Sequence, residues 1–306
     1  MTRDITNNRN ESLREGRVLL SRSLLIENRI GSVFVHVSEL RSSAEWYARL
    51  LNVEVQEQRL VGGGPVYWFE LEGTGIILDS NRENRLDPAW REEMKPRFMF
   101  AASDIDEAYA YTNRRAEVYG ETQDHGSMAY FTFRDPDGNA LMACWTKEGQ
   151  LTVDPTRGDV TSSIQPKVTG VFLDVKNAAE AARWYTDLLG IPLQEESDRT
   201  SGSVYRLPVI SGAVLLLDAN RSRSGEDYSI LFMLGTNDIE EAYTYVQQQG
   251  IDVFTGIERH GEMAFFTVVD PDGNVIMICE ERPWLFFTPG IEDMGGGRAN
   301  SNSPIP

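Results

Sequence analysis

The residues best able to do chemistry in this chain are three histidines and two cysteines. An imidazole titrates near neutral pH and can serve as a general base or a metal ligand. A thiol reacts when a nearby cation or histidine lowers its pKa. His125 and Cys144 open and close the stretch HGSMAYFTFRDPDGNALMAC, which returns as HGEMAFFTVVDPDGNVIMIC from His260 to Cys279 with thirteen of twenty positions identical. The chain is therefore a tandem duplication, and His36, which is not repeated, can be compared with its counterpart Asp174.

The duplication extends through both halves in the same order. A WY pair precedes an LL pair in each half, at 46–51 and at 184–189. LDSNR at 78–82 corresponds to LDANR at 217–221, and DIDEAYAY at 104–111 corresponds to DIEEAYTY at 238–245. These matches predict a polar extension over residues 1–28, a first domain over 29–146, a linker over 147–166, a second domain over 167–284 and a disordered tail over 285–306.

Composition and charge exclude several classes of partner. The net charge of −18 over 306 residues repels phosphate backbones and anionic lipid, so we expect neither nucleic acid nor membrane partners. No apolar run approaches the ~20 residues of a membrane helix, and the N-terminus lacks the order of a secretory signal. A cytoplasmic location follows. Cys144 and Cys279 fall one per domain, which favours reduced thiols.

Each half shows the same alternation of strand and helix patterns. In the first half, β-rich residues 33–37 precede a helical pattern over 42–51, with Ser42 or Ser43 as the expected N-cap. Strands are expected over 53–57, 66–71 and 75–79. The pattern restarts with a strand over 97–101, a helix capped by Ser103 or Asp104, and three more strands. This mixture predicts an α+β fold.

These motifs resemble the vicinal oxygen chelate superfamily, which contains glyoxalase I, bleomycin-resistance proteins and extradiol dioxygenases. The resemblance rests on the opening V-x-V-x-E-L followed by EWYARLLN, on SDIDEAY, and on F-x-x-DPDGN before the last strand. It covers about 250 residues in two copies. It implies two βαβββ modules per domain, with a mixed sheet curled around a central cavity.

Catalytic members of that superfamily hold a divalent metal in the cavity. The resemblance places their ligand positions at residues that are poor ligands for such a cation. In the first domain these are Ser32, Arg97, Met142 and Ile77, and in the second Gly170, Leu231, Met277 and Leu216. We therefore expect no metal and no cofactor.

The histidines have different expected roles. His36 lies four residues after Ser32 on one strand, so the period of two puts both on the cavity side. His36 and Asp174 are thus weak catalytic candidates. His125 and His260 each precede a glycine where a loop enters a strand, and their rings are expected to hydrogen-bond the turn backbone.

The remaining candidates would line the cavity. Met142, Cys144, Met277 and Cys279 alternate on the inward face of the last strands, as core packing or as a soft lining for an apolar ligand. Trp68 could stack on a planar ligand, whereas the second domain has Arg206 there. DPDGN is expected to form a tight turn. The predicted ligand-binding residues are Ser32, His36, Trp68, Arg97, His125, Met142, Asp174, His260 and Met277.

Three functions remain open. The sequence favours a metal-free protein that binds a small apolar or aromatic molecule, of a sequestration or resistance type. The first alternative is a glyoxalase- or dioxygenase-like lyase, isomerase or oxidoreductase, with a rearranged or a metal-independent site. The second is a structural or assembly module whose cavities are filled. Pairing of two chains into a homodimer is compatible with all three.

Overall fold

A computed structural model describes residues 25–147, 163–193, 200–201, 203–207, 209–225, 227–261 and 263–281. The predicted N-terminal extension up to residue 24, most of the linker and the tail lie outside the described residues. Among the helices of the described part, none is long and apolar enough to cross a membrane.

The first domain forms one seven-stranded mixed sheet, in the order β2-β3-β1-β4-β7-β6-β5. Strand β1 joins its two modules, because it pairs parallel with β3 and antiparallel with β4. Its elements are β1 Ile26–His36, α2 Leu40–Leu51, β2 Val66–Phe69, β3 Gly75–Asp79, β4 Phe98–Ala102, α3 Ile105–Thr112, β5 Glu117–Asp124, β6 Met128–Arg134 and β7 Ala140–Thr146, with 3-10 turns at Glu57–Arg59, Asn84–Leu86 and Glu92–Met94.

The second domain repeats this architecture. Its sheet runs β13-β14-β15-β12-β8-β11-β10-β9, the same order with one short strand added at the edge. Cys144 pairs with Tyr130 on the neighbouring strand and Cys279 with Phe265, so the repeated residues occupy equivalent strands, as the duplication predicts. The elements are β8 Val168–Asp174, α4 Ala178–Leu189, β9 Thr200–Ser201, β10 Val204–Leu207, β11 Val214–Asp218, α5 Asn220–Ser224, β12 Ile230–Gly235, α6 Ile239–Gln248, β13 Val253–His260, β14 Met263–Val269 and β15 Val275–Glu281.

Two local predictions were wrong. The segment 53–57 is not a strand, because no neighbour pairs with it; the Gln56 N–H donates to the Tyr67 hydroxyl at 2.9 Å instead. Helix α2 begins at Leu40 after Glu39, which makes no side-chain cap, and Ser42 and Ser43 lie inside the first turn with their hydroxyls donating to the Glu39 carbonyl. The predicted cap at Asp104 is confirmed, since its carboxylate accepts from the Glu107 N–H at 2.9 Å.

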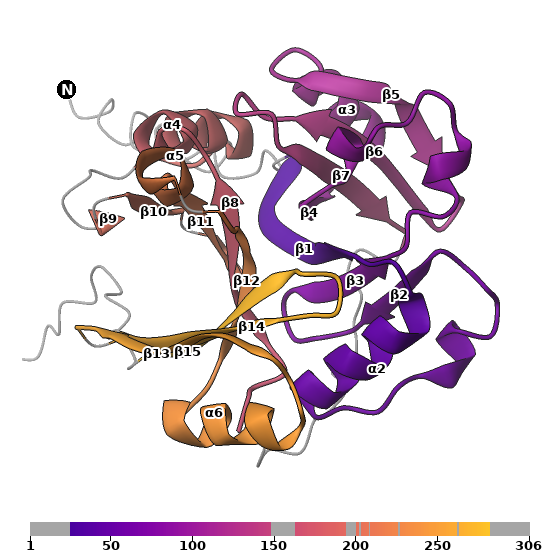
Figure 1. Cartoon of the computed structure of the whole chain (residues 1–306). Helices are drawn as coiled ribbons and strands as arrows, with labels where there is room; N and C mark the ends of the chain where they lie inside the picture. The colour runs from indigo at the N-terminus through magenta and orange to yellow at the C-terminus, as the bar shows by residue number, and fades with distance from the viewer. Residues whose placement is uncertain are drawn as a thin grey trace, which may run out of the picture.

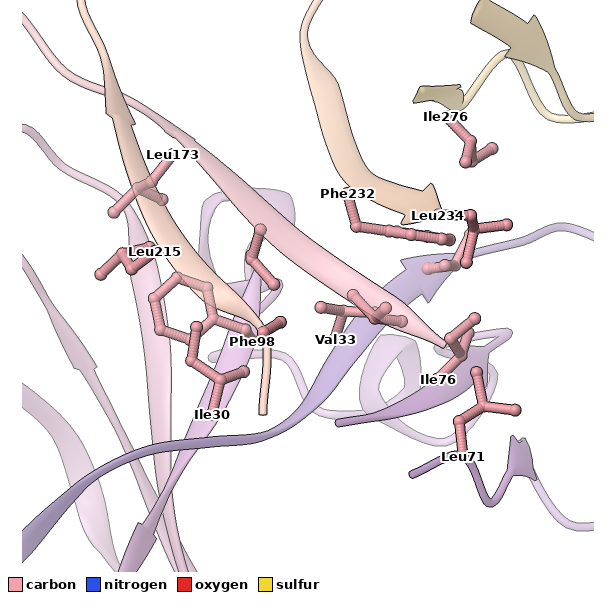
Figure 2. Packing of buried hydrophobic residues seen from close by; sticks show 14 of the residues in the cluster. Ile30, Val33, Leu71, Ile76, Phe98, Leu173, Leu215, Phe232, Leu234 and Ile276 are labelled. Atoms are coloured by element: carbon pink, nitrogen blue, oxygen red, sulfur yellow. The ribbon is translucent and has the colours of Figure 1, made fainter. Parts of the chain in front are cut away.

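The two sheets share one hydrophobic core. Val33, Ile76 and Phe98 of the first domain and Leu234 and Ile276 of the second belong to a single cluster of buried residues. Figure 2 shows these side chains meeting between strands of both domains. In Figure 1 the strands β1, β8 and β12 meet at the centre of the molecule. One face of each sheet is therefore committed to packing, and the side chains of the opposite face lie outside the shared core.

The DPDGN turns join the two domains. Each first aspartate is buried and accepts a hydrogen bond from a buried tyrosine of the other domain: Tyr47 donates to Asp270 at 2.9 Å, and Tyr185 to Asp135 at 2.8 Å. The turn asparagines also cross over, to the carbonyls of His36 and Asp174. The predicted turn role of DPDGN was thus incomplete, because the same residues connect the domains.

Further contacts repeat this reciprocity. The hydroxyl of Tyr111 donates to the carbonyl of Asp187 at the end of α4, and that of Tyr245 to the carbonyl of Arg49 at the end of α2. Equivalent loops meet at Gly73 and Gly212, where a Cβ on Gly73 would lie 2.8 Å from the Gly212 Cα. Both glycines have positive φ, so this close approach requires them. The two domains are related by an approximate two-fold axis.

We expect Tyr47→Phe and Tyr185→Phe to lower the free energy of unfolding by about 1–3 kcal/mol each, because each change removes a donor from a buried carboxylate. Chemical denaturation measures this effect. Tyr109→Phe is the control, since the Tyr109 hydroxyl bonds the Gly120 carbonyl within its own domain at an exposed site. Equal small losses in all three variants would contradict a special role for the interdomain pairs.

Candidate functional site

The outer face of the first sheet, opposite the shared core, is curled. Asp79 on β3 and Tyr130 on β6 are separated by three strands. In Figure 1 strand β1 is bent, with β2 and β3 on one side of it and β4, β7, β6 and β5 on the other, so the sheet curls into a concave face. Burial raises the pKa of Tyr130, and the negative charge of Asp79 raises it further.

Apolar side chains form the floor of this concave face. Trp68, Ile77 and Phe34 align across β2, β3 and β1, and Met99 pairs with Met142 across β4 and β7. These positions alternate with residues of the shared core, as strand geometry requires. Phe34 is buried, Ile77 and both methionines are half-buried, and Trp68 is exposed. The floor is thus partly open to solvent.

The Trp68 ring lies on the concave side, while Tyr67 and Phe69 pack toward helix α2. The Arg59 guanidinium lies 4.6 Å from the centroid of the indole, and the indole N–H donates to Glu70 at 3.3 Å. The ring is therefore held in place with one face covered by a cation. Arg59 covers one face of the indole, so the predicted stacking of a planar ligand on Trp68 requires the opposite face.

His36 is held by protein partners on both ring nitrogens. Its Nε2 lies 2.9 Å from the Pro96 carbonyl, and its Nδ1 lies 3.0 Å from the Asn81 side-chain nitrogen. The carbonyl can only accept and the amide nitrogen can only donate, so the ring is neutral with its proton on Nε2. Burial is the main reason that its pKa falls to about 4. Action as a general base stays a prediction that requires one of these bonds to break.

Asp174 occupies the equivalent strand end but has other partners. Its Oδ2 lies 3.3 Å from an Arg221 nitrogen, and its carbonyl accepts from Asn139 of the first domain. His36 and Asp174 thus belong to different domains and contact different residues. In the described part of the chain, no hydrogen bond or ion pair joins His36 to Asp174.

His125 and His260 lie flat on neighbouring rings instead of bonding the turn backbone. His125 stacks on Tyr130 and His260 on Phe265, both with ring centroids 5.6 Å apart. His260 also approaches Glu258 at 3.4 Å. Both histidines are exposed, so stacking on a half-buried ring satisfies them better than the predicted backbone bond. His125 therefore lies beside Tyr130, a polar residue of the concave face.

The Arg97 side chain reaches the second domain. Its Nη2 donates to the Ser229 hydroxyl of the second domain at 2.9 Å. Arg97 thus reaches the second domain at the seam between the domains, and its role in lining the first cavity stays a prediction. Its counterpart Leu231 packs against the shared core.

The concave face of the second domain is filled. Phe172, Met233, Met277 and Cys279 form a separate buried cluster there. A Cβ on Gly170, the expected first-strand ligand position, would lie 3.1 Å from both Leu216 and Met233. No space remains at that point for a ligating side chain.

The residues do not fit the divalent metal that the superfamily implies. Over the described ranges, no group of three or more His, Cys, Asp or Glu side chains could hold a metal ion. Ser32, Ile77 and Met142 offer one hydroxyl, a hydrocarbon and a thioether. Cys144 is buried, which raises its pKa to about 11 and keeps it a thiol.

Sequence reasoning missed three residues of the polar end: Asp79, Asn81 and Tyr130. Asp79 is buried, and desolvation raises its pKa. Its Oδ1 accepts from the Asn81 N–H at 2.7 Å, and Asn81 adopts a left-handed φ of 52°. The sequence did contain a signal for these residues. Asp79 and Asn81 belong to the motif LDSNR, which recurs as LDANR, and Tyr130 is one of the positions at which the two copies differ, with Phe265 in the second.

Two surface hollows lie away from both concave faces. One of about 490 Å³ flanks the C-terminal end of α2 beside Tyr245, and one of about 420 Å³ flanks the corresponding end of α4. They occupy equivalent places in the two domains, as the approximate two-fold axis requires.

The low pKa of His36 predicts a pH-dependent stability. Between about pH 6.5 and pH 4 the unfolded chain binds a proton at this residue and the folded chain does not, so stability falls as pH falls through that window. The loss is on the order of 3 kcal/mol. Denaturation of His36→Gln should show a weaker pH dependence than the parent, with exposed His260→Gln as control. Parallel curves for the parent and His36→Gln would contradict the buried neutral ring.

Comparisons with known proteins agree with this geometry. The Glyoxalase/Bleomycin resistance protein/Dioxygenase superfamily profile matches residues 29–143 and 168–278, well over half of the chain. No curated protein sequence matches the chain.

Several solved structures share the fold. The Mn(II)-bound glyoxalase from Novosphingobium aromaticivorans is 19% identical with a TM-score of 0.55, over 84% of this chain and 83% of that one. A catechol 2,3-dioxygenase is 16% identical with a TM-score of 0.54, over 84% and 90%. Homoprotocatechuate 2,3-dioxygenase from Arthrobacter globiformis is 16% identical with a TM-score of 0.52, over 84% and 80%. The profile match and the shared fold together show that the chain belongs to the Glyoxalase/Bleomycin resistance protein/Dioxygenase superfamily, as two tandem domains.

Proposed function

We propose that the chain binds a small, largely apolar or aromatic molecule on the concave face of the first domain, without a metal. The observation that carries this proposal is the different exposure of equivalent methionines. Met99 and Met142 are half-buried, whereas Met233 and Met277 are only 5% and 7% exposed. The first domain therefore keeps accessible apolar surface where the second has closed it. Methionine suits such a surface, because its flexible thioether adapts to irregular ligands.

The polar end of the face would orient the ligand. Asp79 supplies a carboxylate, Tyr130 a hydroxyl that donates to Gln123 at 2.7 Å, and Trp68 an aromatic ring on the strand next to that of Asp79. A mostly apolar site with a few placed polar groups is typical of small-molecule binding. The second domain has Phe265 and Arg206 at the tyrosine and tryptophan positions, so it lacks this combination.

The concave face of the second domain is packed with its own side chains, which indicates a structural role. Its cluster of Phe172, Met233, Met277 and Cys279 packs as a small core. We propose that this domain serves as a scaffold, which holds the first domain through the reciprocal interdomain contacts. The idea of filled cavities, one of the alternatives that the sequence left open, would then apply to one domain of the two.

Native mass spectrometry of protein purified directly from cells tests the proposed binding. We expect one retained organic molecule per chain and no stoichiometric metal. A chain mass equal to that of the polypeptide alone, together with no binding of any planar hydrophobic probe, would contradict the proposal.

Trp68→Ala should weaken the binding of a planar probe such as naphthalene or indole by about 1–3 kcal/mol, because it removes apolar surface and a stacking partner. Calorimetry measures the change. Arg206→Ala, the equivalent position of the second domain, is the matched control and should leave the affinity unchanged. Unchanged affinity in Trp68→Ala would leave the site without its aromatic anchor.

Elemental analysis of the purified protein should find well under one Zn, Ni, Mn or Fe per chain, because the family ligand positions carry no suitable donor set. Reloading with each metal after chelation should leave probe binding unchanged. One tightly held metal per chain would instead support the enzyme alternative with a rearranged site.

A further inference from the structure

Arg97 is a largely enclosed cation at the seam between the domains. Its guanidinium crosses from the start of β4 to Ser229, just before β12, and donates one hydrogen bond of 2.9 Å. The residue keeps some exposed surface, yet burial is the largest influence on the guanidinium and lowers its pKa. A buried charge is costly unless it is paired, so its partners decide what the seam can do.

Within the described part of the chain, no carboxylate forms an ion pair with Arg97. The acidic group that acts on it electrostatically is Asp174, which raises its pKa, while Arg221 lowers it. The Asp174 carboxylate is bound by Arg221 at 3.3 Å. These three side chains carry one net positive charge. A guanidinium has five N–H donors, and one of those on Arg97 has an acceptor among the described residues.

The duplication shows that the fold does not need this cation. The equivalent of Arg97 is Leu231, which packs against the shared core, and the equivalent of Asp174 is His36. The polar seam therefore exists on one side of the approximate two-fold axis. An apolar side chain serves the same backbone position in the other domain, so a ligand is a better explanation of Arg97 than architecture.

We propose that the seam binds a small monovalent carboxylate, held by the Arg97 guanidinium with the Ser229 hydroxyl and Arg221 beside it. A planar carboxylate matches the fork of N–H donors that a guanidinium presents. Because Asp174 balances one of the two arginines, one positive charge remains, and it matches a ligand with a single negative charge. The residues of this site differ from those of the proposed apolar site of the first domain, and the site does not depend on the proposed ligand there.

Acetate, compared with sodium chloride at equal ionic strength, is the probe. In thermal denaturation of the full chain, acetate should stabilise the parent protein saturably and beyond the effect of chloride. Arg97→Leu, which copies the second domain, should lower the apparent acetate affinity by roughly tenfold or more. Arg183→Leu, at an exposed arginine of α4, is the matched control and should behave as the parent.

The stability without acetate provides a second measurement. If Arg97 lacks a counterion, Arg97→Leu should melt at the same temperature as the parent or higher, because it removes a partly buried charge that has no ion pair. A much lower melting temperature would overturn the proposal, since it would mean that protein groups already satisfy Arg97. Equal responses of the parent to acetate and chloride, or an undiminished acetate response in Arg97→Leu, would overturn it as well.

Discussion

The reciprocal hydrogen bonds between buried tyrosines and turn aspartates are the interactions on which the rest of the structure depends. Tyr47 reaches Asp270, and Tyr185 reaches Asp135, at 2.9 and 2.8 Å. Burial raises the pKa of both aspartates and of both tyrosines, so each group needs the other inside the protein. The turn that closes the last strand pair of each domain is thereby attached to the first helix of the other.

This attachment decides which surfaces are free. It brings the inner faces of both sheets into one core, where Val33 and Phe98 meet residues such as Leu234. A sheet has two faces, and the shared core takes one of them. The surfaces outside this core are the outer concave faces, the hollows at the helix ends and the seam between the domains.

Duplication then allowed the two concave faces to diverge. The same strand positions hold half-buried Met99 and Met142 in one domain and buried Met233 and Met277 in the other. Neither face keeps the ligand set that the superfamily uses for a metal, and Gly170 has Leu216 and Met233 packed over it. The solved structures with the same fold include an Mn(II)-bound glyoxalase. The shared fold therefore carries no statement about the chemistry of this chain, because chemistry depends on side chains that have changed.

The sequence by itself determined the duplication, the α+β class and most of the order of the elements, and it limited one helix cap to Ser103 or Asp104, because periodicity, repeats and capping act over a few residues. Tertiary structure decided the rest. Segment 53–57 has strand-forming residues but no partner, so it stays irregular. The neutral ring of His36 depends on Asn81 and Pro96, which lie 45 and 60 residues away. The direction of Arg97 depends on Ser229, 132 residues along the chain. Such partners are chosen by long-range packing, which local patterns do not encode.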